Sequence, residues 1–280
     1  MRLIDMGINL MHPSFDRDRE AVIRRAEEAG VSPLIITGTG VDSSRDASCY
    51  AEQYGKNHSP RKLYATAGVH PHDAKACGGD TIAMLRELAG RAEVIAIGEC
   101  GLDYNRDFSP RPVQRQWFEK QVELAAELGM PLFLHERDAF EDFSGVLKNA
   151  SGRLKNFVVH CFTGTGSELD RYLSLGAHIG ITGWICDERR GGHLGALVPR
   201  IPPDRLMVET DGPFLLPRNL PQTAPDAGEG GGKKRTPKSG RNEPAFLPHI
   251  VRTLAGALGK DAEQLASETL ANTLRFFGIE

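Results

Sequence analysis

Short apolar runs alternate with amphipathic segments along most of the chain. Eight runs have the length and composition of buried strands, and the segments between them repeat apolar residues at helical spacing. The apolar runs span residues 2–8, 34–37, 63–69, 94–98, 130–134, 157–159, 177–181 and 205–208. Eight rounds of strand and helix favour a closed (β/α)8 barrel, the TIM barrel of the α/β class, over an open sheet. A length of 280 residues suits one such domain over residues 1–280.

Capping residues mark where several helices begin and end. Ser14 is expected to cap a helix that ends at Gly30, and Ser109 with Pro110 is expected to open a helix that ends at Gly129. Two further helices are expected after Pro244 and after Asp261, and the apolar positions on them predict core packing.

One stretch breaks the pattern, at about residues 221–241. Residues 221–240 hold five glycines and three prolines, and residues 218–241 hold six basic and two acidic side chains. This composition predicts a surface insertion after the eighth strand. Two interpretations stay open: a solvated insertion without a role, or an electrostatic guide for a polyanion.

Composition limits the classes of protein to consider. The formal net charge of -3 excludes a globally basic nucleic-acid binder, so any nucleic-acid contact must be local. Five cysteines without a C-x-x-C pair indicate a reducing compartment. The chain shows no signal segment and no apolar run long enough to span a membrane. We therefore expect a cytoplasmic protein without a membrane partner, and a monomer by default.

Four metal-competent side chains follow four different apolar runs: Glu99, His135, His160 and Asp211. A TIM barrel brings the carboxyl ends of its strands to one face, where its active site lies. A lone histidine at a strand end is more often a hydrogen-bonding residue, but four such residues favour a metal site. Nitrogen and oxygen donors without thiolate suit Mg²⁺, Mn²⁺ or Zn²⁺. We expect Glu99 and Asp211 to be catalytic, with Asp211 also accepting a proton from water.

Further polar residues are expected near this site. His70 and His72 flank Pro71 at the exit of the third strand, where they can contact substrate, transfer a proton or merely stabilise the loop. Arg137 lies two residues after His135 and is a candidate phosphate contact. Arg189 and Arg190 are candidates of the same kind, with simple surface charge as an equal alternative.

At this point the motifs identify a resemblance that covers nearly the whole chain. The sequence resembles the TatD-type metal-dependent deoxyribonucleases, a family of amidohydrolase-like barrels, and most closely its bacterial branch. The resemblance is carried by the motifs DMGINL (5–10), AGVHPH (67–72), AIGECGLD (96–103), HCFTG (160–164), ITGWICDERR (181–190) and ETDGP (209–213). It implies a (β/α)8 barrel and Mg²⁺-dependent hydrolysis of phosphodiesters. It also implies 3′→5′ exonuclease action on single-stranded DNA or RNA, in DNA repair or turnover.

The resemblance places Glu99, His135, His160 and Asp211 on the family's ligand positions. One departure concerns the D-x-H-x-H motif that begins most of the wider family, because Gly7 and Asn9 stand at its two histidine positions. Glycine cannot ligate, so one firmly bound ion fits better than a full pair, and one or two ions remain possible. Asn9 is then expected to contact substrate.

Two other functions compete with the nuclease. The first is an amidohydrolase that acts on a small acylated substrate. The second is a binding role without catalysis, in which loss of the two N-terminal histidines reflects a decayed site. Retention of all four ligand candidates argues against decay.

Overall fold

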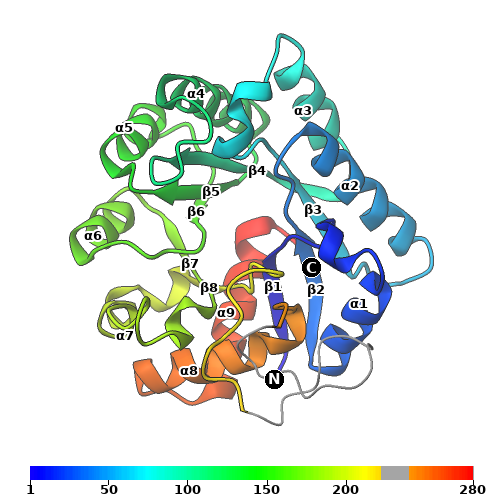
Figure 1. Cartoon of the computed structure of the whole chain (residues 1–280), viewed down its shortest axis with the longest axis vertical. Helices are drawn as coiled ribbons and strands as arrows, with labels where there is room; N and C mark the ends of the chain where they lie inside the picture. The colour runs from blue at the N-terminus through cyan, green and yellow to red at the C-terminus, as the bar shows by residue number, and fades with distance from the viewer. Residues whose placement is uncertain (222–239, 280) are drawn as a thin grey trace. The chain divides into compact units, whose positions relative to one another are not determined.

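The structure is a computed structural model that describes residues 1–221 and 240–279. Within them, eight parallel strands alternate with helices and follow one another in sequence order in one sheet (Figure 1). This is the TIM-barrel fold that the apolar pattern predicts. The strands are Leu3–Ile8 (β1), Val31–Ile36 (β2), Leu63–Ala67 (β3), Val94–Asp103 (β4), Leu132–Arg137 (β5), Phe157–Val159 (β6), His178–Ile181 (β7) and Leu206–Val208 (β8). The α-helices are Arg19–Glu28 (α1), Val41–Gly55 (α2), Thr81–Ala89 (α3), Arg111–Leu128 (α4), Phe140–Ala150 (α5), Gly166–Ser174 (α6), Leu194–Leu197 (α7), Leu247–Leu258 (α8) and Ala262–Phe277 (α9).

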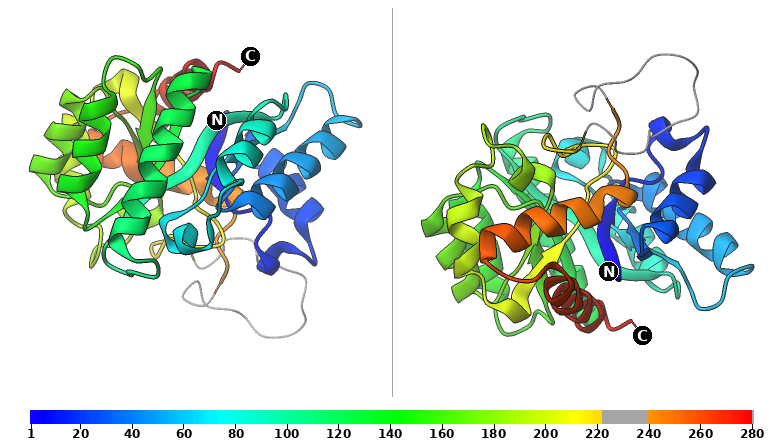
Figure 2. Two further views of the ribbon diagram at one scale, coloured as in Figure 1. Left: turned by 90° about the horizontal axis from the view of Figure 1, so that it is seen from above. Right: turned by 90° about the horizontal axis from the view of Figure 1, so that it is seen from below.

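The described chain forms two compact units, and the first comprises residues 1–35 and 180–273. In it β1 lies beside β8, and α8 packs against β1, as the right view of Figure 2 shows. A buried carboxylate ties α1 to the segment before α8, because Arg25 donates to both oxygens of Glu243 at 2.8 and 2.7 Å. The side chain of Glu243 is only 2% exposed, so this ion pair is shielded from solvent.

The second unit comprises residues 36–179 and 274–280, and its complete strands run from β3 to β6. The pairing of β4 with β5 runs from Ile97–Leu132 to Asp103–Arg137 and is longer than that of β3 with β4 or of β5 with β6. Helix α4 packs against β4 and α5, on the outer side of these strands (Figure 1). The rings of Phe118 on α4 and Phe143 on α5 stack 5.0 Å apart and are fully buried, which fixes the two helices on each other.

Two predicted helix starts are wrong. Ser14 lies in the 3-10 helix Pro13–Phe15, and α1 begins only at Arg19 after Asp18. Helix α4 begins at Arg111, and the Ser109 hydroxyl instead donates to the His72 carbonyl oxygen at 2.7 Å. The Ser14 hydroxyl pairs with the ring of nearby His12, whereas the partner of Ser109 is distant in the sequence. The helix ends at Gly129 and Gly259 are confirmed, because both glycines adopt a left-handed conformation with φ of 62°.

Three further expectations concern the chain as a whole. Residues 222–239, which make up most of the predicted basic insertion, lie outside the described residues. The assignment of residues 1–280 to a single domain stays a prediction. In the described ranges, no helix has both the length and the apolar character that crossing a membrane requires.

Candidate metal centre

The backbone of β4 positions the carboxylate of Glu99 by an irregularity in its pairing with β5. Gly98 pairs with Phe133 and Cys100 with Leu134, so Glu99 is an extra residue between two pairs. Its N–H donates to the carbonyl oxygen of Gly38 at 2.7 Å instead of to β5. Such a bulge re-aims the side chain of the extra residue. Strand β4 also continues to Asp103, five residues beyond its predicted end at Gly98.

Three imidazole rings converge on one oxygen of Glu99. The Oε1 atom lies 2.8 Å from Nε2 of His160, 3.0 Å from Nδ1 of His135 and 3.3 Å from Nε2 of His70. These histidines follow β6, lie within β5 and follow β3, respectively. The structure therefore brings together Glu99, His135 and His160, as predicted from their places after apolar runs, and adds His70 to the cluster.

Asp103 is the second carboxylate of the cluster, and its role was not recognised from the sequence. Its Oδ2 atom lies 2.7 Å from Nε2 of His72 and 3.5 Å from Nε2 of His135. Its Oδ1 atom accepts the N–H groups of Asn105 and Arg106 at 3.0 and 2.8 Å. Nε2 of His135 therefore lies near the carboxylate of Asp103, while Nδ1 of the same ring faces Glu99. This arrangement is typical of a metal-binding histidine and its supporting carboxylate.

The backbone around His70 and His72 is not extended, contrary to the expectation from their spacing. His70 precedes the 3-10 helix Pro71–Ala76, and its Nδ1 atom accepts the N–H of His72 at 3.1 Å. The two rings meet edge to face with centroids 4.2 Å apart. Both rings nevertheless face the cluster, because the turn directs His70 to Glu99 and His72 to Asp103.

Two buried glutamines of α4 support this backbone. Gln121 accepts the N–H of Val69 at 2.7 Å and donates to the carbonyl oxygen of the same residue at 3.1 Å. Gln114 does the same for Asp103, at 2.8 and 3.1 Å. The glutamines are seven residues apart and so lie on the same face of the helix. One rigid helix therefore fixes the approaches to both His70 and Asp103.

The charge states of the cluster follow from burial and neighbours. Burial alone would raise the pKa of Glu99, but the positive potential of the surrounding imidazoles holds this pKa well below its usual value. Burial lowers the pKa of His70 to about 4, against the opposing effect of Glu99. For His135 the hydrogen bonds to Asp103 and Glu99 outweigh burial and raise the pKa. The centre therefore presents an ionised carboxylate beside a neutral imidazole of His70 near pH 7.

This donor set fits a divalent cation. His70, Glu99 and His135 each offer one ligand atom, and these atoms lie within 4.8 Å of one another. The Nε2 atom of His160 lies in the same place, 2.8 Å from Oε1 of Glu99 and 3.4 Å from Nδ1 of His135. Nitrogen and carboxylate oxygen are donors for Zn²⁺, Mn²⁺ or Mg²⁺ in catalytic sites. The site thus meets the requirement for a metal on chemical grounds.

Asp211 lies in the other unit, formed by residues 1–35 and 180–273, shortly after β8. Its φ of 55° is a left-handed conformation that aspartate tolerates better than most residues. Its Oδ1 atom accepts a hydrogen bond from Nδ2 of Asn9 at 2.9 Å, and its N–H donates to the carbonyl oxygen of Gly7. Gly7 and Asn9, which stand where the wider family carries histidines, therefore hold the turn and the carboxylate of Asp211.

The carboxylate of Asp5 stabilises the same turn by hydrogen bonds to Gly7 and Thr210. Its side chain is fully buried, and its Oδ1 atom accepts the N–H of Thr210 at 2.9 Å and that of Gly7 at 3.3 Å. The Thr210 hydroxyl donates to the other oxygen. Burial raises the pKa of Asp5 to about 7, with a smaller contribution from nearby Glu209.

The three predicted arginines are exposed and differ in their contacts. Arg137 ends β5, two residues after His135. Arg189 is 69% exposed with its Nε atom 3.7 Å from Oδ1 of Asp187, whereas Arg190 lies over the ring of Trp184, 5.5 Å from the centroid.

A TIM barrel with histidines gathered around a buried glutamate defines the class of metal-dependent hydrolases. Comparison with known proteins gives the family: residues 4–278 match the model described as TatD related DNase, and the chain belongs to this family. It is 50% identical over 275 residues to the 3′-5′ ssDNA/RNA exonuclease TatD of Dickeya dadantii, covering 98% of this chain and 97% of that protein. It is 48% identical over 277 residues to the protein of the same name from Erwinia tasmaniensis, with 99% and 100% coverage. Among solved structures, YjjV, a TatD homolog from Escherichia coli, superposes with a TM-score of 0.85 at 26% identity, covering 100% of this chain and 99% of that chain.

Proposed function

We propose that this chain is a metal-dependent 3′→5′ exonuclease that hydrolyses phosphodiester bonds of single-stranded DNA or RNA. The observation that carries the proposal is the convergence of three imidazole nitrogens on Oε1 of Glu99, in a chain of the TatD-related DNase family. The exonuclease activity for which the relatives at 48–50% identity are named agrees with that chemistry. Within residues 1–221 and 240–279, no structural feature favours the amidohydrolase or the non-catalytic alternative.

The ion would be held by Glu99, His135, His160 and Asp211, with His70 as a further ligand of the same cluster. Mg²⁺ is our first choice from the family resemblance, and the imidazole donors also suit Mn²⁺ or Zn²⁺. Because neither Gly7 nor Asn9 supplies a strong ligand, one ion is preferred over two. When bound, the ion lowers the pKa of water and stabilises negative charge on the phosphate.

The side chains around the ion divide the proton chemistry. The Asp211 carboxylate accepts the proton of the attacking water, and the amide of Asn9, 2.9 Å from its Oδ1, orients it. His72 is held through Nε2 by Asp103, which orients the ring for substrate contact or for proton transfer.

Contacts beside the cluster suit an unpaired strand. The ring of Phe108 is 55% exposed and lies 4.7 Å from the ring of His72, so a large apolar face is open to solvent next to the centre. Nucleobases of single strands stack on such aromatic side chains, whereas the bases of a duplex are covered by their own stacking. The guanidinium of Arg137, two residues after His135, is a candidate contact for the phosphate.

Digestion of a single-stranded oligonucleotide labelled at its 5′ end tests the function directly. Products that shorten from the 3′ end with Mg²⁺, Mn²⁺ or Zn²⁺, and that vanish with EDTA, are expected. Glu99→Gln and Asp211→Asn should each abolish the products while the circular dichroism spectrum stays unchanged. Glu127→Gln, on an exposed residue of α4, is the control and should cleave normally. Intact oligonucleotide after incubation with folded, metal-loaded protein would refute the proposal.

We further propose a cytoplasmic monomer with a role in DNA repair or turnover. All five cysteines are free, which fits a reducing compartment. Cell fractionation and sedimentation velocity test the first two statements. Unchanged survival of a deletion strain after DNA damage would count against the third.

A further inference from the structure

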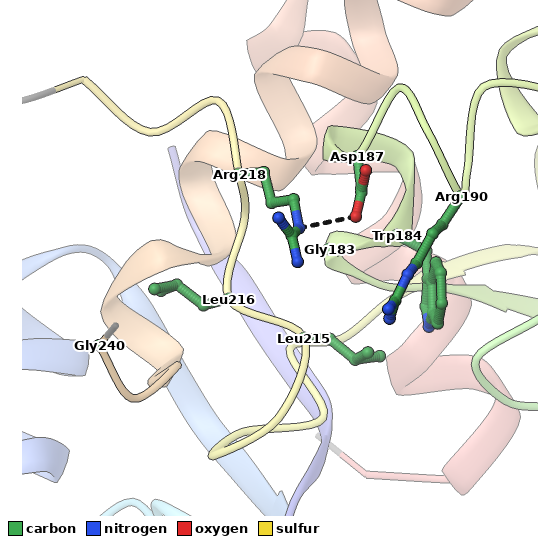
Figure 3. A pocket seen from close by; sticks show the side chains of 8 residues that line it. All are labelled: Gly183, Trp184, Asp187, Arg190, Leu215, Leu216, Arg218 and Gly240. Atoms are coloured by element: carbon green, nitrogen blue, oxygen red, sulfur yellow. Dashed lines mark ion pairs between the residues drawn. The ribbon is translucent and has the colours of Figure 1, made fainter. Parts of the chain in front are cut away.

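A polar pocket separate from the metal-binding cluster lies in the unit formed by residues 1–35 and 180–273, on the loop that follows Asp211. It encloses about 200 Å³ and is lined by two segments that meet face to face, residues 183–190 and 215–218, together with Gly240 (Figure 3). The two segments touch closely, because a Cβ atom on Gly183 would lie only 2.2 Å from the carbonyl oxygen of Leu215. Leu215 is the fourth residue after Asp211, so one loop carries both the candidate proton acceptor and a wall of this pocket.

Positive charge exceeds negative charge in the pocket. Its charged lining residues are Arg190, Arg218 and Asp187. The Asp187 carboxylate is largely buried, and its Oδ2 atom pairs with Nε of Arg218 at 2.8 Å. The Arg190 guanidinium lies over the ring of Trp184, so it is held by a neutral partner (Figure 3). The lining therefore carries two cations and one carboxylate, which leaves the pocket attractive to an anionic group.

The aromatic residue gives the pocket a second chemistry. Trp184 is half-buried, and its indole ring lines the cavity beside Leu215. An indole face stacks with any nucleobase, and an arginine beside it can contact the phosphate of the same nucleotide. Arg189 differs, because it points to Oδ1 of Asp187 at 3.7 Å and does not line the pocket.

We propose that this pocket binds one nucleotide of a single-stranded nucleic acid, with its phosphate between Arg190 and Arg218 and its base against Trp184. The inference rests on the proposed function and extends it, because the strand is bound at a nucleotide other than the one whose bond is hydrolysed. The geometry also separates the two neighbouring arginines, since it assigns the contact to Arg190 and leaves Arg189 outside.

A binding experiment tests the pocket without any turnover. The Glu99→Gln protein, incubated with EDTA, is titrated with a ten-nucleotide oligo-dT while tryptophan fluorescence is recorded. The chain has two tryptophans, and Trp117 is buried, so quenching reports mainly on Trp184. Quenching by the oligonucleotide, but not by inorganic phosphate at the same concentration, is expected. Trp184→Phe should remove the quenching yet keep the affinity measured by anisotropy of a labelled strand.

Arg190→Gln and Arg189→Gln form a matched pair that removes the same charge one residue apart. Arg190→Gln should weaken binding about tenfold and lower the slope of log affinity against log salt by about 0.7, the effect of one phosphate contact on a single strand. Arg189→Gln should leave both within twofold of the parent. Equal effects of the two variants, or quenching by phosphate alone, would overturn the assignment of a nucleotide site.

Kinetics then distinguish failure of the pocket from failure of the proposed function. In the Glu99-containing enzyme, Arg190→Gln should raise KM for the oligonucleotide about tenfold. Its kcat, and its hydrolysis of the small diester bis(p-nitrophenyl) phosphate, should stay unchanged. Normal KM in an active nuclease would overturn the pocket alone, whereas loss of all hydrolysis in the parent enzyme would overturn the nuclease and leave the binding result standing.

Discussion

The substitution Asp103→Asn tests most directly whether this carboxylate supports the histidines of the metal centre. The variant keeps an oxygen at Oδ1, so the N–H groups of Asn105 and Arg106 retain their acceptor. At Oδ2 it places an amide N–H₂, 2.7 Å from Nε2 of His72 and 3.5 Å from Nε2 of His135. An amide N–H₂ is no acceptor, so Nε2 of His135 can no longer donate a hydrogen bond at this position. We expect the ring proton of His135 to move from Nε2 to Nδ1, the atom that faces Glu99.

A protonated Nδ1 cannot bind a cation, so metal affinity should fall. Loss of a carboxylate that supports a metal-binding histidine typically lowers metal affinity or activity about 10- to 100-fold. This corresponds to about 1.4–2.7 kcal/mol, since each factor of ten is about 1.4 kcal/mol. The stability of the fold should change little, because the two backbone hydrogen bonds and the packing of the side chain remain.

Isothermal titration with Mn²⁺, alongside kcat/KM on a 5′-labelled oligonucleotide, measures the effect. Asp107→Asn is the matched control, because it makes the same chemical change on an exposed residue that forms an ion pair with Arg111. The control should behave as the parent protein. An Mn²⁺ dissociation constant within twofold of the parent for Asp103→Asn would refute the supporting role of this carboxylate.

Three other predictions follow from buried groups. Because the pKa of Asp5 is raised to about 7 in the folded chain, its contribution to stability is full below pH ~4 and is lost as pH rises through 7. Urea unfolding should show the Asp5→Asn variant gaining about 2 kcal/mol relative to the parent between pH 5 and pH 8, and parallel pH profiles would contradict this. Arg25→Met leaves the Glu243 carboxylate buried with only a 3.6 Å contact to another arginine, so it should destabilise the fold by about 2–4 kcal/mol, and adding Glu243→Gln should recover much of the loss. Gly101→Ala would place a Cβ atom 1.8 Å from the carbonyl oxygen of His135 at a φ of 147°, so we expect little folded protein, whereas a normal melting curve would exclude this clash.

The order of strands and helices could be predicted because strands buried on both faces leave continuous apolar runs in the sequence. Glu99, His135 and His160 could be found for the same reason, since each follows such a run. Asp103 was missed because β4 was expected to end at Gly98. The alternation of Glu99, Gly101 and Asp103 along one strand is the signal that could have found it.

Long-range contacts explain most of what the sequence did not reveal. The bulge at Glu99 depends on the register with β5, which no local pattern encodes. Gln114 and Gln121 look like surface residues of an amphipathic helix, yet they are buried because backbone groups of other segments satisfy them. Ser109 was mistaken for a helix cap because its true partner, the carbonyl of His72, is 37 residues away.

The loop from Asp211 to Arg218 has a consequence for how specificity can change within this fold. It carries the Asp211 carboxylate, which we propose accepts a proton, and the pocket residues Leu215, Leu216 and Arg218. Asp211 and Arg218 are only seven positions apart. An insertion or deletion there would displace both at once, so changes of length are a hazard to turnover. Exchange of single side chains at Leu215, Leu216 or Arg218 leaves the backbone of Asp211 in place. Diversification of substrate preference should therefore occur here by replacement of residues at constant loop length.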